Sequence, residues 1–238
     1  MDSDLSNLKK YRIFDLSHSL YHRMPGWPGH SQFLIKDLRI MNVDGYAVKD
    51  IYLNTHHGTH IDAAAHMIDG GKTLDKYPLS NFIGNGVVLD LSFKKAGEPI
   101  GAADLKKFDN CLIENDMIFL YTGWSRKRSN SVEYLYLWPY LDCSGAEYLA
   151  HKKMKVVGTD GLSIGGWSSD NAVHTAITDS AKNVHTTILG SDAIIAEEVA
   201  NLDKVLEEEK CSRAFFIISP LNIIESDGSP VRIYAFKR

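Results

Sequence analysis

Four of the ten histidines of this 238-residue chain lie within one short stretch, together with an aspartate. The stretch runs from residue 56 to residue 66 and contains His56, His57, His60, Asp62 and His66. Imidazole and carboxylate groups are ligands that zinc and related divalent ions take from proteins. The cluster therefore predicts a metal site. The alternative is a histidine-rich surface loop or a set of hydrogen-bonded core histidines.

The spacing within this cluster allows its side chains to converge on one point. Gly58 permits a turn that brings His56 and His60 together. His60 and Asp62 share one side of an extended chain, and Asp62 and His66 share one side if a helix begins at Asp62. The HExxH metalloprotease motif is excluded, because a histidine follows His56 where that motif requires glutamate. The lack of paired cysteines excludes a zinc finger.

Alternating strand and helix signals surround the cluster and must position it. Apolar, strand-like runs occur at residues 12–16, 46–53, 86–91, 117–121, 156–158 and 214–218. Several are almost continuously apolar, as is typical of strands covered on both faces. Helices are predicted over residues 102–108 and 202–210, and another begins at Ser144, which has capping-box spacing to Glu147. The pattern predicts one α/β domain over residues 1–238 with a mixed sheet.

The composition argues against several classes of partner. The chain has 26 basic and 30 acidic residues, a net charge of −4, and so no electrostatic preference for nucleic acid or an anionic membrane. No apolar run reaches the roughly 18 residues of a membrane span. The polar start of the chain lacks the features of a secretory signal, so a cytoplasmic location is expected. The widely separated cysteines Cys111, Cys143 and Cys211 are predicted to be ordinary buried thiols of a reducing compartment.

Several blocks of the sequence resemble one family of enzymes. Residues 56–66 read HHGTHIDAAAH, which resembles the HxGTHxDxPxH signature of the cyclase family of metal-dependent hydrolases; kynurenine formamidases and isatin hydrolases belong to that family. Further family-like blocks follow in the family's order, at residues 15–20 (DLSHSL), 24–29 (MPGWPG), 122–124 (TGW), 157–163 (VGTDGLS) and 197–202 (EEVANL). Two positions differ, because Ala64 replaces the proline of the signature and Tyr121 replaces an arginine before TGW.

The resemblance implies a site with two neighbouring metal positions. His56, His60 and Asp62 would bind the first ion. Asp62 would bridge to a second ion, held also by His185 and Glu197. Zinc is the expected ion and manganese the alternative, with one or two ions per subunit.

The resemblance also assigns roles to His66 and Trp27. His66 would act as the general acid and base, since a histidine pKa of about 6.5 suits proton transfer at neutral pH; the alternative is a hydrogen-bond partner of the ligands. Trp27 would form an aromatic wall for a planar substrate, or would simply pack. For Glu197 the alternative is a surface glutamate, as its neighbour Glu198 is expected to be. His57 is expected to point away from the site, as a packing residue or a hydrogen-bond partner of the ligands. His151 and His174 have no motif support and are expected to be structural.

The implied fold is a single α/β swivelling domain of β/β/α type, in which outer helices surround a mixed, barrel-like sheet. The implied reaction is metal-dependent hydrolysis of a C–N amide bond in a small molecule, with N-formylkynurenine as the expected substrate. The alternatives are a cyclic amide such as isatin, a polyketide-type cyclase or dehydratase reaction, and a closed structural metal site without activity.

The resemblance finally implies a homodimer or larger homo-oligomer. Residues 134–141 form a charge-free aromatic run, in which Pro139 argues against a central strand. Tyr and Trp are enriched at interfaces, so we expect this run to lie near the contact between subunits or over the pocket of the partner. The alternative is that it covers the core of its own chain.

Overall fold

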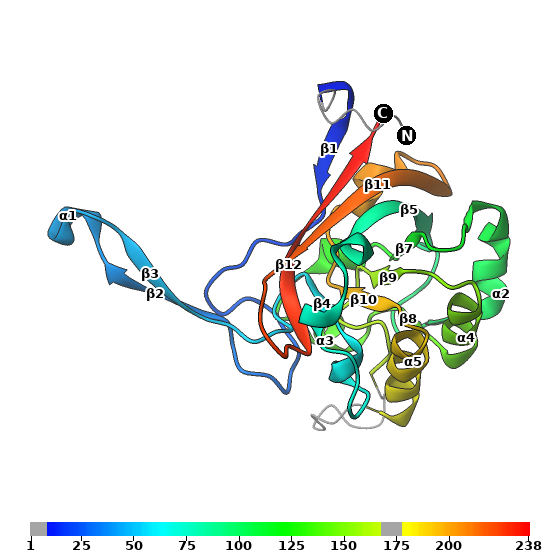
Figure 1. Cartoon of the computed structure of the whole chain (residues 1–238), viewed down its shortest axis with the longest axis horizontal. Helices are drawn as coiled ribbons and strands as arrows, with labels where there is room; N and C mark the ends of the chain where they lie inside the picture. Colours follow the sequence, from blue (N-terminus) through cyan, green and yellow to red (C-terminus); the bar gives the residue numbers. More distant parts are fainter. Residues whose placement is uncertain (1–8, 168–177) are drawn as a thin grey trace.

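The computed structural model describes residues 9–167 and 178–238, and within them seven strands close into a mixed barrel (Figure 1). Their order is β12, β11, β5, β7, β9, β10 and β4, and β4 pairs again with β12. The pairs among β5, β7, β9 and β10 are parallel and the others are antiparallel; β1 extends the sheet beyond β12. The strands are β1 (Arg12–Asp15), β4 (His60–Asp62), β5 (Ile83–Asp90), β7 (Met117–Tyr121), β9 (Val156–Thr159), β10 (Ile194–Glu197), β11 (Cys211–Pro220) and β12 (Gly228–Lys237). The predicted barrel-like mixed sheet is confirmed. The predicted structural role of His174 is not tested, because this residue lies outside the described residues.

Alternate residues of the central strands serve two separate cores, as the two-residue period of a strand requires. One cluster consists of side chains from one face of these strands and includes Val88, Phe119, Ile194 and Phe216. In the other cluster, side chains from the opposite face pack against the apolar faces of helices. It includes Val87, Ile118, Ile195, Leu149 and Ile188. Because both faces are covered, these strands read as continuous apolar runs in the sequence.

Three of the helices cover one side of the barrel. Helices α2 (Ala102–Leu105), α4 (Cys143–His151) and α5 (Asp179–Gly190) lie together on that side (Figure 1). The other short elements are α3 (Val132–Tyr136), α6 (Leu202–Leu206), the paired strands β6 (Pro99–Ile100) and β8 (Tyr140–Leu141), and the 3₁₀ turns η2 (Ala64–His66), η3 (Leu74–Lys76), η4 (Leu79–Phe82), η5 (Lys106–Cys111) and η6 (Trp124–Lys127). None of the helices in the described ranges has the length and apolar composition of a membrane span.

Two predicted helix ends differ from the structure. The cap of α4 is Asp142 rather than Ser144, because the Asp142 carboxylate accepts the hydrogen bond of Gly145 N at 2.9 Å. Helix α6 ends at Leu206 and not at residue 210, because Glu207 and Glu208 both adopt left-handed backbone conformations with φ of 50° and 70°.

Residues 34–52 form an arm that projects away from the barrel (Figure 1). The arm consists of the antiparallel strands β2 (Leu34–Arg39) and β3 (Val48–Tyr52), joined through α1 (Met41–Asp44). The predicted strand at residues 46–53 is thus present, but it belongs to the arm and not to the barrel. Most arm side chains are exposed, including apolar ones such as Met41 and Val43.

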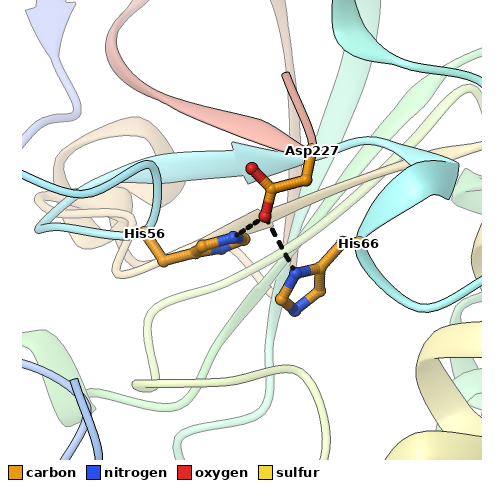
Figure 2. A group of neighbouring side chains, drawn as sticks. All are labelled: His56, His66 and Asp227. Carbon is orange, nitrogen blue, oxygen red and sulfur yellow. Dashed lines mark hydrogen bonds and ion pairs between the residues drawn. The ribbon is translucent and has the colours of Figure 1, made fainter. Parts of the chain in front are cut away.

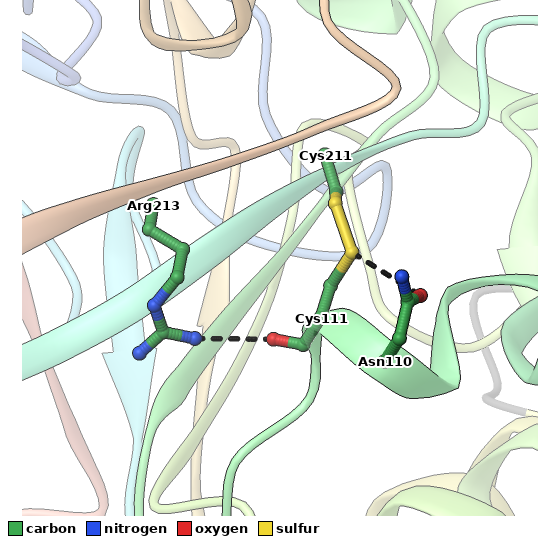
Figure 3. The surroundings of a disulfide bond; sticks show 4 residues. All are labelled: Asn110, Cys111, Cys211 and Arg213. Carbon is green, nitrogen blue, oxygen red and sulfur yellow. Dashed lines mark hydrogen bonds between the residues drawn. A yellow bond between two sulfur atoms is a disulfide. The ribbon is translucent and has the colours of Figure 1, made fainter.

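Cys111 and Cys211 form a disulfide bond, so the prediction that all three cysteines are thiols is wrong for these two (Figure 3). Cys143 is a free cysteine. The fold brings the end of η5 beside the start of β11, although 100 residues separate the cysteines in the sequence. Arg213 stabilises this junction, because its Nη1 donates to the Cys111 carbonyl at 3.1 Å and its Nη2 pairs with Asp116.

We expect reduction of this disulfide to lower the free energy of unfolding by about 2–5 kcal/mol, because the bond closes a long loop in the unfolded chain. Urea unfolding with and without dithiothreitol measures the change. The double variant Cys111→Ser/Cys211→Ser should show the lower stability and no response to the reductant. An unchanged wild-type midpoint in dithiothreitol would contradict a stabilising disulfide.

Candidate metal centre

Strand β4 positions His60 and Asp62 because it pairs with a strand on each side. Its pairing with β10 places His60 opposite Glu197. Its pairing with β12 places Asp62 opposite Gly228. Opposed residues of an antiparallel pair point to the same face of the sheet, so the register alone brings His60 beside Glu197.

The turn before β4 brings His56 to the same point. Gly58 has a φ of +66°, a left-handed conformation in which any other residue would be strained, so this turn favours glycine. His56 Nδ1 lies 2.9 Å from Asp62 Oδ1, and His60 Nε2 lies 3.4 Å from the same oxygen. The residues predicted to bind the first ion therefore form one group, with ligand atoms within 4.8 Å of one another.

Asp62 also belongs to a second such group, with His185 and Glu197. His185 lies on the buried face of α5, and its Nε2 is 3.2 Å from Glu197 Oε1. The same Glu197 oxygen accepts hydrogen bonds from Ser163 Oγ at 3.0 Å and from Ile164 N at 2.7 Å. The Asp62 carboxylate is thus shared by the two ligand groups, which is the arrangement that a bridging role requires.

The donor atoms of the site fit a divalent ion. His60 and His185 each donate an Nδ1–H to a backbone carbonyl at 2.7 Å, of Gly58 and Ala181 respectively, which leaves each Nε2 available to an ion. Asp62 Oδ2 is buried and has no hydrogen-bond partner among the described residues. A buried carboxylate oxygen without a partner is costly, and a metal ion would satisfy it.

The charges of the site depend on one another. Burial opposes the ionisation of Glu197, but hydrogen bonds from His185 and His60 hold the pKa of its carboxyl well below the usual value. Burial also opposes a positive charge on His56, yet hydrogen bonds to two carboxylates raise the pKa of its ring to about 10. Protons and metal ions compete for these nitrogens, so the affinity for metal must fall as the pH is lowered.

Asp227 is a site residue that the sequence analysis missed. It lies between His56 and His66, with its Oδ2 2.7 Å from His56 Nε2 and 3.4 Å from His66 Nδ1 (Figure 2). His66 reaches this position on the 3₁₀ turn η2 and not on a helix that begins at Asp62. The available signal was an aspartate followed by glycine at residues 227–228, but nothing in the sequence placed that pair near residue 56.

A cavity of about 200 Å³ opens beside the two ligand groups. Besides the histidines and Glu197, its walls are formed by Trp27, Met67, Leu162, Ser163 and Glu198. The ring of Trp27 lies 4.9 Å from that of Trp167 and 5.9 Å from that of Trp138, so this wall is both aromatic and well packed. The cavity is smaller than the roughly 300–1,000 Å³ of sites for drug-sized ligands, and it therefore suits a small molecule.

Glu198 is buried, so the expectation that it is a surface residue is wrong. It is 1% exposed, and its backbone has a φ of +49°, a conformation that residues other than glycine rarely adopt. Its Oε2 accepts hydrogen bonds from Arg128 Nε at 3.1 Å and from the Tyr134 hydroxyl at 3.4 Å. Its backbone carbonyl accepts from the Thr59 hydroxyl at 2.6 Å. Glu198 therefore ties the end of β10 to the turn that carries His56 and His60.

The structure brings the predicted site residues together. Asp62 is fully buried within the two ligand groups, and the other six line this one cavity: Trp27, His56, His60, His66, His185 and Glu197. His57 points away from the ligand groups, as predicted. Its Nδ1 accepts from Asn54 N at 2.9 Å and its Nε2 donates to the Ser31 carbonyl at 2.8 Å.

Comparison with known proteins relates the whole chain to one set of enzymes. The family model described as "putative cyclase" matches residues 14–165. The kynurenine formamidase of Geobacillus thermodenitrificans is 29% identical over 219 residues, which cover 92% of this chain and 94% of the relative. That of Erythrobacter litoralis is 26% identical over 225 residues, 93% of this chain and 92% of the relative.

Solved structures show the same relationship. A "predicted metal-dependent hydrolase" from Bacillus stearothermophilus superposes with a TM-score of 0.72 at 25% identity, over 96% of this chain and 99% of that one. An isatin hydrolase bound to the product analogue thioisatinate shares the fold, with a TM-score of 0.85 at 20% identity over 100% of this chain and 99% of that one. These relatives support a hydrolase, and the family model covers more than half of the sequence. The chain therefore belongs to the cyclase family.

Proposed function

We propose that this protein hydrolyses the C–N amide bond of a small aryl formamide, with N-formylkynurenine as the first candidate substrate. The observation that carries the proposal is that two groups of ligand residues share Asp62. Both groups lie beside a small cavity with an aromatic wall. The relatives named kynurenine formamidase, which match nearly their whole length, support this choice of substrate.

The metal ions would be held by the two groups that share Asp62. His56 and His60 complete one group, and His185 and Glu197 complete the other. Zinc is the ion we propose and manganese the alternative, because histidine and carboxylate ligands suit both. When bound, such ions polarise the carbonyl of an amide and acidify water. The cavity beside the ligands favours a catalytic site over a closed structural one.

The protein's own side chains would supply binding and proton transfer. Trp27 offers a ring to a planar aryl group. His66 lines the cavity without belonging to either group that contains Asp62. We propose that His66 Nε2 takes a proton from the attacking water and delivers it to the leaving nitrogen as the C–N bond breaks.

We expect the protein loaded with zinc or manganese to hydrolyse N-formylkynurenine and formanilide, and a chelator to abolish this activity.

Asp62→Asn keeps the shape of the side chain but removes the negative charge between the two groups. This variant should lose at least one equivalent of metal and nearly all activity. The fold should survive, because the core is large enough without metal. Elemental analysis, an absorbance assay and circular dichroism provide the three measurements.

Asp69→Asn is the matched control for Asp62→Asn, because Asp69 is exposed and lies in the same part of the chain. It should retain both metal and activity. A full metal complement in Asp62→Asn would contradict the bridging role. Turnover of isatin without turnover of formamides would assign the site to cyclic amides, and no turnover of any amide by the fully loaded protein would refute an amide hydrolase.

His66→Ala should keep its metal and lower kcat by roughly 10²–10⁴-fold, the usual effect of removing a general acid and base. The exposed His151, at the end of α4, provides the control His151→Ala, which should change neither quantity. Joint loss of metal and activity in His66→Ala would show instead that His66 is a ligand.

We further propose that the protein is a homodimer and that the arm (residues 34–52) forms the contact. Residues 134–141 pack mainly within their own chain, since Tyr134, Trp138 and Leu141 are each at most 1% exposed. The arm instead exposes nine large apolar side chains: Leu34, Leu38, Ile40, Met41, Val43, Tyr46, Val48, Ile51 and Tyr52. An isolated two-stranded ribbon is only marginally stable in water, and a standard interface covers about 800 Å² per partner. A second copy is the partner we propose, because the arm leads directly into the loops of Trp27 and His56.

Light scattering at micromolar concentration should therefore report a dimer of the 26.6 kDa chain. The double variant Val43→Lys/Ile51→Lys should shift it to a monomer, because it places charges on the apolar surface of the arm. Leu79→Lys, at a position that is 77% exposed outside the arm, should leave the dimer intact. A fully active wild-type monomer would contradict the proposal.

A further inference from the structure

Asp227 enters the site through the closure of the barrel. It directly precedes β12, whose residue Gly228 pairs with Asp62 of β4. The Asp227 carbonyl accepts the hydrogen bond of Ala63 N at 2.8 Å. A Cβ on Gly228 would lie 2.6 Å from the Ile61 carbonyl oxygen, so only glycine allows this close approach. These contacts hold the backbone of Asp227 against the segment that runs from His56 to His66.

The hydrogen bonds of Asp227 fix the proton positions on two rings. A carboxylate only accepts hydrogen bonds. Asp227 Oδ2 lies 2.7 Å from His56 Nε2 and 3.4 Å from His66 Nδ1 (Figure 2), so each of these nitrogens must carry the proton. The Asp227 side chain is 41% exposed, and an aspartate with this access to water is a carboxylate at neutral pH. With Nδ1 protonated, His66 has Nε2 available for chemistry.

We propose that Asp227 is a positioning residue for His66, one that holds the ring in the tautomer and orientation required for proton transfer. This inference rests on the proposed function, in which water adds to the amide carbonyl carbon. Nε2 of His66 receives the water proton and passes it to the nitrogen as the C–N bond breaks. The Nδ1 proton remains bonded to Asp227 throughout. The carboxylate therefore stabilises the positive charge that the ring carries between the two transfers, the logic by which an aspartate assists histidine in other hydrolases.

His56, His66 and Asp227 could also hold a metal ion as a group, so the experiment must distinguish a ligand from a positioning residue. Asp227→Asn keeps the size of the side chain, but its amide can donate to His66 Nδ1 and favour the other tautomer. We expect this variant to bind the wild-type number of metal ions at saturating metal, with KM little changed and kcat reduced roughly 10²-fold or more.

Two readouts test the positioning role directly. The loss of kcat should be smaller for 4-nitroformanilide than for formanilide, because the better leaving group depends less on protonation. In ¹⁵N NMR spectra, with the His66 signals assigned from their absence in His66→Ala, wild type should show an Nδ1–H tautomer that Asp227→Asn loses. Glu225→Gln removes a charge from the same loop without contacting either histidine among the described residues, and should match wild type in every measurement.

Loss of a metal equivalent in Asp227→Asn would make Asp227 a ligand and overturn the proposal. Wild-type kcat, or an unchanged His66 tautomer, would overturn it as well. The NMR readout does not require turnover, so it tests the Asp227–His66 pair even if the protein hydrolyses no amide. Failure of the proposed function can thus be distinguished from failure of this inference.

Discussion

The register of strand β4 determines both the closure of the barrel and the geometry of the site. This strand has three residues, and the middle one, Ile61, is fully buried in the core cluster with Phe119 and Phe216. Successive side chains of a strand alternate between its faces, so burial of Ile61 directs His60 and Asp62 together to the opposite side. All three residues are buried, so a slip of one residue would turn the two ligands toward the apolar cluster and the isoleucine toward the metal site. The hydrophobic effect on one side chain thus fixes the position of two polar ones.

The site concentrates three buried carboxylates and compensates their charges in two different ways. Asp62 and Glu197 lie among histidines, whose charge can be exchanged for that of an ion. Glu198 is buried beside Glu197, but its side chain forms an ion pair with Arg128, whose own side chain is 8% exposed. This pair gives Glu198 a compensating charge of its own, so it need not compete with Glu197 for the ligand nitrogens. A buried pair of this kind adds little net stability. The backbone of Glu198 is also left-handed, a strained conformation that persists only where the surrounding structure holds it in place.

The sequence predicts those parts of the fold and site that depend on local order. The cluster at residues 56–66 was recognisable because its ligands lie close together around Gly58, and the apolar runs at residues 86–91 and 117–121 correspond to buried strands of the barrel. What it could not predict depends on tertiary pairing. The position of Asp227 follows from the register of β12 on β4, and the Cys111–Cys211 bond follows from the packing of η5 beside β11. Glu198 looked like a surface residue because acidic residues are rarely buried, and the partners that compensate it, Arg128 and Tyr134, lie more than 60 residues away in the sequence.

The closure of the barrel also constrains the order of events during synthesis. His56, His60 and Asp62 leave the ribosome well before β12, the strand that closes the barrel against them. At about 5–20 residues per second, translation from β4 to β12 takes on the order of ten seconds or more. During that interval the nascent chain carries a histidine cluster without the carboxylates of Glu197 and Asp227, and contacts so distant in sequence form slowly. The centre is therefore assembled only after β12 has been made, and metal that reaches the chain before β12 pairs with β4 would meet only a fragment of it.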